Sequence, residues 1–351
     1  MAFQTVKNVK IAGVSGCVPK KVEENKGHKV FDSVIDSEKF IATTGVERRH
    51  IANDDTTTSD MCFHAAEKLL AELNWSKDSV DCLVFVTQTP DYILPATSCI
   101  LQDRLKLSEE CYTLDISLGC SGWVYGLSTI STLLSSGDMK RGLLLCGETT
   151  LKPVSKTDKS AYPLFGDAGT ATAIEFSENN TINFHLATDG SGFEAIIIPD
   201  GGYRNPFTAD SLSHEEIEPG ISRNKLQTIL NGMDVFSFGI SKAPQTVNKL
   251  LGYIGREIQD IDYAVFHQAN LFMNEKIRKK LKLDQQQVPY SLKNYGNTSS
   301  ASIPITMITE LREQLQTQRL NNITCGFGVG LSWGSAYFET DRIVVPELVI
   351  I

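Results

Sequence analysis

An internal repeat limits the folds open to this chain more than any other feature of the sequence. The segment VDCLVF at 80–85 resembles IDYAVF at 261–266, and each is an apolar run of strand length after an acidic turn. LKL recurs at 105–107 and 281–283, and Gly-Cys-Ser at 119–121 falls opposite Gly-Asn-Thr at 296–298. The separations are 181, 176 and 177 residues, so few loop insertions distinguish the copies. We predict two related halves, residues 1–176 and 177–351.

Strands alternate with helices along the chain, which is typical of an α/β fold with largely parallel sheets. Strands are expected over 6–18, 80–87 and 143–146, and helices over about 36–44, 58–73 and 121–136. The Gly-rich segment 165–174 is expected to enter a strand. A phosphate-binding loop is the competing interpretation, but the segment lacks G-x-x-x-x-G-K-[ST]. Residues 199–222 are rich in Pro, Gly and acidic residues and predict a surface excursion.

Composition excludes several classes of protein. A net charge of −9 argues against nucleic-acid binding through a general basic surface. The eight cysteines show no C-x-x-C spacing and no Cys/His cluster, so we expect no metal site and a reducing compartment. The N-terminus lacks the apolar core of a signal peptide, and no run approaches the roughly 20 apolar residues of a membrane span. We expect a cytoplasmic protein.

Cys120 lies at the centre of LDISLGCSGW, residues 114–123, which predicts a short strand, a sharp turn and the start of a helix. Unpaired N–H groups and the dipole at a helix N-terminus favour a thiolate, the form of Cys that attacks carbon. A buried Cys in a tight turn is an equally good interpretation of this stretch alone. Both interpretations therefore stay open at this point.

The repeat places two further side chains near Cys120. Asn297 occupies the position opposite Cys120, and His267 ends the apolar strand of the second half, where parallel sheets bind ligands. Taken singly, His267 is as easily a structural histidine, and Asn297 a turn residue. A Cys, a His and an Asn facing one crevice are the chemistry of acyl-thioester transfer.

Several motifs together resemble one family. These are Cys120, HQAN at 267–270, GNTS at 296–299, GFGVGLSWGSA at 326–336, FGD at 165–167 and DGS at 189–191. In this combination the chain resembles 3-oxoacyl-[acyl-carrier-protein] synthase III over nearly its whole length. The resemblance implies a thiolase-like fold of five layers, α-β-α-β-α, with two duplicated halves, mixed and mostly parallel sheets, and usually a homodimer.

The resemblance also implies a decarboxylative Claisen condensation. Cys120 would take an acyl group from acyl-CoA or an acyl carrier protein (ACP), and the enolate formed when malonyl-ACP loses CO2 would attack it. His267 and Asn297 would donate hydrogen bonds to the malonyl thioester oxygen. The acyl oxyanion would lie on the backbone N–H groups of Cys120 and of the turn at Gly328 and Val329, where most relatives have Gly in place of Val329. No metal or redox cofactor is implied.

Substrate contacts implied by the family depart from its usual pattern. The Trp and Arg that contact CoA are not reproduced at residues 39–43, and the Arg that usually follows the HQAN run is Phe272. Leu94 replaces the bulky aromatic residue that a partner subunit inserts into the acyl pocket. We therefore expect weakened acetyl-CoA recognition and a specialised synthase that loads a longer or functionalised acyl group. The residues implied to contact the thioester donor are Lys159, Asn270 and Phe272.

A basic helix after His267 is the expected docking site for ACP, because ACP is acidic. Lys279 and Lys280 match docking positions of the family, and Lys276 and Arg278 lie beside them. A solvated basic face is the alternative interpretation of this cluster.

Two other functions stay open. One is an acyltransferase of the thiolase superfamily that moves the Cys-bound group to an oxygen or nitrogen nucleophile, although the Asn is then unnecessary. The other is a non-catalytic subunit of a heterodimeric synthase, against which the presence of Cys120 counts. The sequence does not indicate the acyl donor or its chain length.

Overall fold

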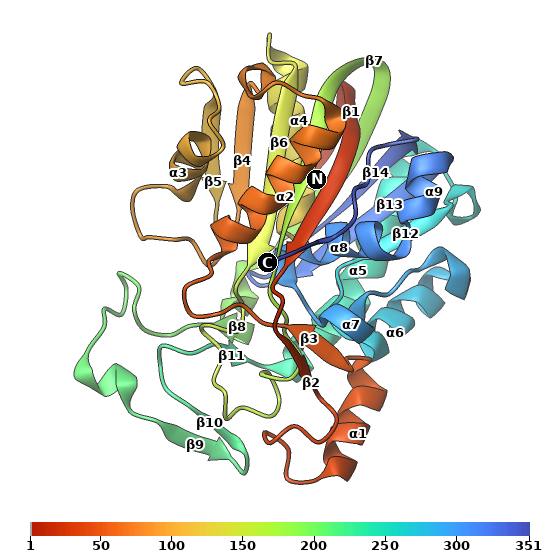
Figure 1. The fold of residues 1–351 in the computed structure, drawn as a ribbon. Coiled ribbons are helices and arrows are strands. Elements are labelled where there is room, and N and C mark those ends of the chain that lie inside the picture. Colours follow the sequence, from red (N-terminus) through yellow and green to blue (C-terminus); the bar gives the residue numbers. More distant parts are fainter. Residues whose placement is uncertain (1) are drawn as a thin grey trace.

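The computed structural model describes residues 2–351 (Figure 1). Nine strands are hydrogen-bonded into one continuous sheet with two parts, called here the first and the second sheet, which share a pair of long strands. β1 (Ala2–Val18) runs antiparallel to β7 (Ala168–Thr188) along nearly its full length. The start of β1, residues 2–7, pairs with 181–186, and the remainder pairs with 169–176 after a shift of register. Each end of this ribbon therefore belongs to a different sheet. The predicted division between residues 176 and 177 falls within β7, beside the register shift, and stays a prediction.

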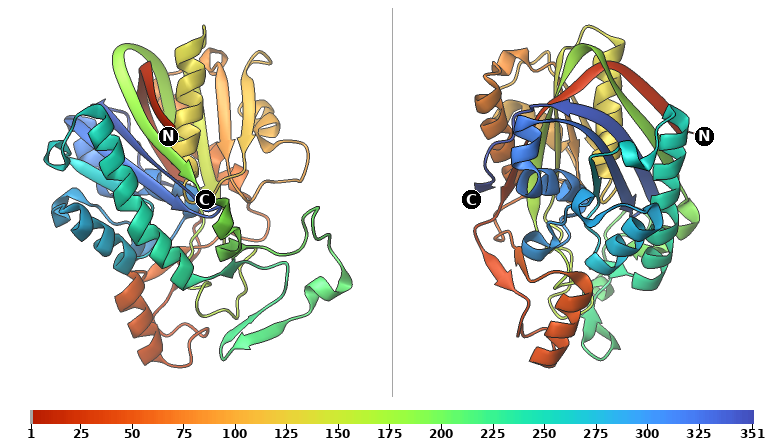
Figure 2. Two further views of the ribbon diagram at one scale, coloured as in Figure 1. Left: turned by 180° about the vertical axis from the view of Figure 1, so that it is seen from behind. Right: turned by 90° about the vertical axis from the view of Figure 1, so that its right-hand side faces the viewer.

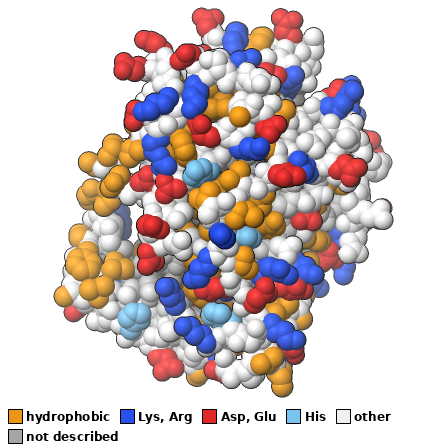
Figure 3. All heavy atoms as spheres, viewed as in Figure 1, with side chains coloured by type: hydrophobic (Ala, Val, Ile, Leu, Met, Phe, Trp, Pro, Cys, Tyr) orange, Lys and Arg blue, Asp and Glu red, His pale blue; other side chains and the backbone are white. Residues whose placement is uncertain are grey.

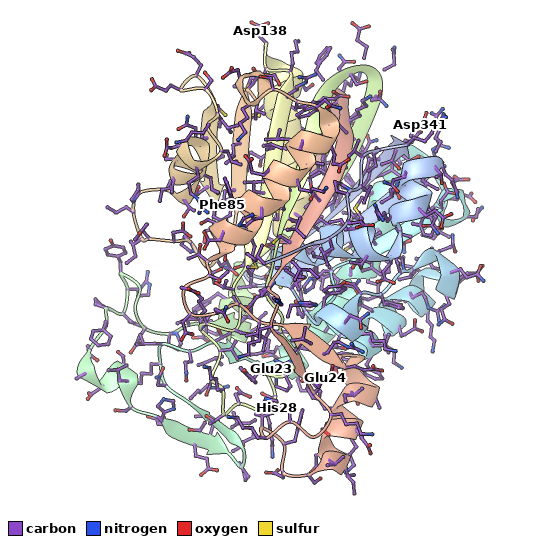
Figure 4. All side chains as sticks on the ribbon, viewed as in Figure 1. Glu23, Glu24, His28, Phe85, Asp138 and Asp341 are labelled. Atoms are coloured by element: carbon purple, nitrogen blue, oxygen red, sulfur yellow. The ribbon has the colours of Figure 1, made fainter. Side chains whose placement is uncertain are left out.

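The first sheet has the order β5-β4-β6-β7-β1. Its inner strand β4 is parallel to both neighbours and buried along its length, as predicted for a strand covered on both faces. Phe85, labelled in Figure 4, is one of the fully buried side chains of β4. The strands introduced here are β4 (Cys82–Val86), β5 (Tyr112–Ile116) and β6 (Arg141–Glu148).

The second sheet has the order β12-β13-β14-β7-β1, with β12 parallel to β13 and the other pairs antiparallel. Short strand pairs lie outside the two sheets, and the 199–222 segment forms an exposed excursion that contains one of them, as predicted. The remaining strands are β12 (Tyr263–Phe266), β13 (Arg319–Gly328), β14 (Ser332–Asp341), β15 (Val349–Ile350) beside β1, and the pairs β2 (Val22–Glu24) with β3 (Arg48–His50), β8 (Ile196–Ile197) with β11 (Ile229–Leu230), and β9 (Glu215–Glu218) with β10 (Ile221–Arg223).

Helices form three layers around the sheets (Figure 2). α4 (Gly122–Ser136) and α8 (Ser302–Glu310) lie in the middle, and α4 contacts strands of both sheets. α2 (Thr58–Leu73) covers the first sheet, whereas α5 (Gly232–Ile254), with α6 (Leu271–Leu281) beside it, covers the second. The predicted order of layers, α-β-α-β-α, is confirmed. The other helices are α1 (Val34–Thr44), α3 (Thr97–Arg104), α7 (Leu292–Tyr295) and α9 (Arg312–Thr317).

Local sequence signals explain where the main helices begin and end. Thr57 and Asp60 form a reciprocal capping box at the start of α2, as the run of capping residues predicted. Gly45 ends α1 in the left-handed conformation that glycine adopts without a steric penalty. α4 is apolar on most of its surface, which suits a helix enclosed between two sheets. No helix within residues 2–351 is both long and apolar enough to cross a membrane.

The repeated blocks share matching structural details in the two halves. Asp81, before β4, accepts a hydrogen bond through Oδ2 from the first backbone N–H of β6, at 2.9 Å. Asp262, before β12, does the same with the backbone of β13 at 2.7 Å. Lys106 and Lys282 lie just after the corresponding helices, 97–104 and 271–281, and have left-handed φ of 55° and 59°. The copies differ in the segment that precedes Gly-Cys-Ser at 119–121 and Gly-Asn-Thr at 296–298. The first half has the strand β5 in this segment, whereas the second half has the helix α7.

Candidate active site

A cavity of about 540 Å³ opens between the two halves, at the carboxyl ends of β4, β6 and β12. Most of its wall is apolar, and it includes Ile196 and Leu230 from the small β8–β11 sheet. Ligands bind at this end of parallel strands in α/β folds. Six residues predicted from the sequence share the cavity wall: Cys120, His267, Asn270, Asn297, Gly328 and Val329.

Cys120 follows β5 and stands just before α4, as predicted. Its Sγ lies 3.9 Å from Ser299 Oγ, and the backbone N–H groups of Val329 and of Cys120 itself are hydrogen-bonded to it. Burial outweighs these stabilising contacts and raises the pKa of the Cys120 thiol to about 11. The backbone N–H groups act in the expected direction, but removal of the thiol from water has the larger effect on its pKa.

The raised pKa predicts a steep pH dependence of Cys120 reactivity. Only the thiolate reacts with iodoacetamide, so the rate of alkylation is expected to rise about tenfold per pH unit from pH 7 to 10. Peptide mass spectrometry after timed exposure would measure this rate for Cys120 alone. A rate that levels off near pH 7 would contradict the high pKa.

His267 ends β12 and is held by a neighbouring serine. Its Nδ1 lies 2.8 Å from Ser302 Oγ, and that oxygen also accepts a hydrogen bond from the backbone N–H of Gln268 at 3.3 Å. The Ser302 proton is therefore free to point at Nδ1, which leaves Nε2 as the protonated nitrogen. Burial lowers the pKa of His267 to about 3, so the ring is neutral near pH 7. Its edge packs against Phe327 with ring centroids 5.5 Å apart.

Asn297 is oriented by the backbone around it. Its Oδ1 accepts a hydrogen bond from the Ser299 N–H at 2.9 Å, and its Nδ2 donates to the Ala269 carbonyl at 3.5 Å, so one N–H of the side-chain amide is left as a donor. Its own N–H and C=O bind Leu164 and Gly166 at 2.9 and 3.1 Å. The cavity therefore presents two neutral donors, one from His267 and one from Asn297.

A fully buried arginine supports the loops that carry Asn297. Arg49 donates to Asn25 Oδ1 at 3.1 Å and to the Tyr162 carbonyl at 3.0 Å. Its Nη2 lies 3.6 Å from Glu23, which Figure 4 labels on β2 below the sheets. Its aliphatic part packs against Gly296, next to Asn297. Arg49 therefore ties the N-terminal β2–β3 pair to the wall of the cavity.

Glu148 is a buried site residue that the sequence reasoning missed. Its carboxylate accepts hydrogen bonds from the Thr87 hydroxyl at 3.1 Å, the Gln88 N–H at 3.0 Å and the Thr89 hydroxyl at 2.9 Å. Burial raises its pKa to about 7 despite these donors. The rule that selected His267, a polar residue after a buried strand, would also have selected Thr87, Gln88 and Thr89 after β4. Residues 2–351 contain no group of three His, Cys, Asp or Glu side chains able to hold a metal ion.

Other residues predicted to bind substrate or partner lie outside the cavity wall. Leu94 is 75% exposed in the loop after β4. Lys159 forms an ion pair with Asp32 at 2.8 Å, and Phe272 stacks on Phe236 at the surface. On α6, Arg278 is bound to Glu275 and to the Leu283 carbonyl, and Lys276 lies over the Phe272 ring. Lys280 donates to the Ile240 carbonyl, and Lys279 forms no ion pair with any of residues 2–351.

Comparison with known proteins identifies the family. Residues 114–190 match the model of 3-oxoacyl-[acyl-carrier-protein] synthase III, and residues 253–340 match the model of its C-terminal part. The beta-ketoacyl-[acyl-carrier-protein] synthase III of Clostridium perfringens is 32% identical over 95% of this chain and 100% of its own. The chain belongs to the 3-oxoacyl-[acyl-carrier-protein] synthase III family.

Further relatives agree with this assignment. The Xanthomonas campestris pv. campestris synthase III is 33% identical over 93% of this chain and 97% of its own length. The crystal structure of a 3-oxoacyl-(acyl-carrier protein) synthase from Burkholderia xenovorans LB400 has 38% identity and a TM-score of 0.93, and covers 99% of both chains. The predicted family, fold and class of enzyme are confirmed: this synthase III is an acyl-transferring condensing enzyme.

Proposed function

We propose that this synthase carries an acyl group on Cys120 and condenses it with malonyl-ACP, releasing CO2 and forming 3-oxoacyl-ACP. The observation that carries the proposal is the convergence of Cys120, His267 and Asn297 on one cavity in a chain of this family. The Cys120 thiolate would attack the acyl thioester, and the carrier thiol would leave with a proton. The N–H groups of Val329 and Cys120, which lie at the sulfur, are placed to bind the oxyanion of this step.

The second step needs a neutral donor pair rather than an acid. Loss of CO2 from the malonyl group leaves an enolate whose negative charge develops on the thioester oxygen. The His267 ring and the second N–H of the Asn297 amide are the groups that would donate to that oxygen, and hydrogen bonds to Ser302 and Ser299 orient both before the substrate arrives. The enolate carbon then attacks the acyl carbon, and Cys120 leaves as the thiolate. These steps consume no redox cofactor.

Ser302 is proposed as the positioning residue for His267. In Ser302→Ala the hydrogen bond to Nδ1 is lost, so the proton can move to Nδ1 and Nε2 no longer donates. We expect condensation with malonyl-ACP to fall about tenfold to a hundredfold, while acylation of Cys120 changes little. Ser302→Thr keeps the hydroxyl and should recover part of the rate. An equal loss in both half-reactions would instead indicate a general structural role.

ACP is the proposed partner, and α6 is its proposed docking surface. Lys279→Glu with Lys280→Glu is expected to raise the KM for malonyl-ACP about tenfold or more and to spare acylation by small thioesters. Lys7→Glu with Lys10→Glu reverses the same charge on β1, on another face, and should leave that KM unchanged. An unchanged KM in the α6 variant would exclude docking there.

A homodimer and a cytoplasmic location complete the proposal. Apolar side chains gather along one edge of the surface in Figure 3, over the loop at 92–94 and the 199–222 excursion. Burial of this edge against a second copy would cover it and bring the Leu94 loop to the neighbouring cavity, as the family implies. All eight cysteines are free, which suits a reducing compartment. Light scattering in solution would test the dimer.

Product analysis tests the proposed reaction. Purified protein with an acyl thioester and malonyl-ACP should release CO2 and form 3-oxoacyl-ACP, both detectable by mass spectrometry. Acyl transfer to an alcohol or amine without CO2 release would instead indicate the alternative acyltransferase. Acetyl-CoA should be one of the acyl thioesters tested. Efficient turnover with acetyl-CoA would exclude specialisation for another acyl group.

A further inference from the structure

One side of the cavity carries polar side chains that the protein itself leaves free. Gln88 and Ser117 line this side, at the carboxyl ends of β4 and β5, which are paired through Val86 and Ile116. Within residues 2–351 neither side chain has a hydrogen-bond partner in the protein, and both residues are exposed to the cavity opening. Apolar residues make up most of the remaining wall, so this polar sector is a local feature.

Gln88 lies directly beside the residue that precedes the nucleophile. A methyl group added to Gly119 would meet Gln88 Oε1 at 2.5 Å, Val329 Cγ1 at 2.9 Å and Ser299 Oγ at 3.1 Å. The carboxamide therefore borders the same small space as Ser299, whose hydroxyl is 3.9 Å from the Cys120 sulfur. An acyl group on that sulfur would therefore start beside the space that the carboxamide borders.

The backbone that carries Gln88 is held rigidly. Its N–H donates to the buried Glu148 carboxylate, and the Thr87 and Thr89 hydroxyls on either side bind the same group. Thr89 Oγ1 also accepts from the Thr149 N–H at 3.0 Å. The backbone of Gln88 is therefore fixed, and the exposed carboxamide at the end of its side chain has no hydrogen-bond partner within residues 2–351.

An unsubstituted alkyl chain in this place would remove the carboxamide from water without replacing its hydrogen bonds, which is unfavourable. A hydroxyl or oxo group at the same place would restore them, and sites built to bind a polar group discriminate strongly against analogues that lack it. We propose that this synthase takes acyl donors with a hydrogen-bonding oxygen substituent close to the thioester, and that Gln88 is the residue that selects them. The inference rests on the proposed acylation of Cys120.

Acylation of Cys120 without malonyl-ACP isolates this selection from condensation. Initial rates are measured by intact-protein mass spectrometry with N-acetylcysteamine thioesters of butanoate, (R)- and (S)-3-hydroxybutanoate and 4-hydroxybutanoate. These small thioesters carry neither CoA nor ACP, so docking does not affect the comparison. We expect at least one hydroxylated donor to acylate the wild-type protein about tenfold faster than butanoyl, or more.

Gln88→Leu and Gln88→Ala should abolish this preference, and Gln88→Leu should accept butanoyl faster than the wild type does. Gln318→Leu, which replaces an exposed glutamine outside the cavity, should keep the wild-type preference. Equal rates for all donors in the wild type, or a preference that survives in both Gln88 variants, would overturn the inference and leave the proposed reaction intact. Failure of every thioester to label Cys120 would overturn the proposed nucleophile, and this inference with it.

Discussion

Cys120→Ser is expected to lower the rate of condensation by at least about a thousandfold, the scale seen when a catalytic nucleophile is removed. Serine fits the same space between Ser299 and the β13 turn, so the fold should be preserved. Its hydroxyl has a far higher pKa than a thiol and is a much weaker nucleophile at neutral pH. Intact-protein mass spectrometry should show no covalent acyl adduct, and the coupled assay with malonyl-ACP should show almost no product.

Cys99→Ser provides the matched control for this experiment. Cys99 is an exposed free cysteine on α3 and does not line the cavity. Its replacement should leave both the acyl adduct and the condensation rate at wild-type levels. A Cys120→Ser protein that condenses at more than a few per cent of the wild-type rate would show that another group carries the acyl chain.

Gly328→Ala is expected to lower condensation about a hundredfold or more while the protein stays folded. The added Cβ would stand 2.5 Å from Cys120 Cβ and 2.8 Å from its Sγ, closer than non-bonded carbon atoms approach. Gly328 is the last residue of β13 and Cys120 begins the turn into α4, so the two backbones must separate to admit the methyl group. A displacement of even about 1 Å in reacting groups costs activity on this scale.

The control for Gly328→Ala is Gly137→Ala. Gly137 follows the last residue of α4, its φ is −146°, and no atom lies within 4 Å of a Cβ built there. We expect this variant to keep wild-type activity, and circular dichroism and thermal unfolding to show both proteins folded. Wild-type activity in Gly328→Ala would mean that the Cys120 turn moves freely, against the close packing described above.

Sequence alone predicted the parts of this enzyme that repeat or that carry periodic apolar residues. The strand-end and elbow positions pointed to His267, Asn297 and Cys120, which the fold brings to one cavity wall, whereas the division between residues 176 and 177 stays a prediction. The pKa of Cys120 could not be predicted in this way. Its local signal, a helix N-terminus, favours the thiolate, whereas burial by the surrounding fold acts in the opposite direction and is larger.

The residues that hold the catalytic groups in place could not be predicted from the sequence either. Ser302 and Glu148 are ordinary polar residues until the fold places Ser302 against His267 and Glu148 against the segment after β4. The ion pair of Lys159, which the resemblance implied as a donor contact, with Asp32 is a further contact that the sequence did not indicate. Contacts of this kind join segments more than 30 residues apart, and no local pattern encodes them.

The shared β1–β7 ribbon has a consequence for how the enzyme is made and how it unfolds. Ala2 pairs with Leu186 and the β1 strand reaches both sheets, so neither half can complete its sheet alone. Pairing across such long sequence separations slows folding, since loop-closure entropy is lost before the contacts form. We expect a single cooperative unfolding transition, with activity and secondary structure lost together. During synthesis the nucleophile is translated early, but the turn at Val329 that shelters it arrives only near the end, so the nascent chain holds no working acylation site.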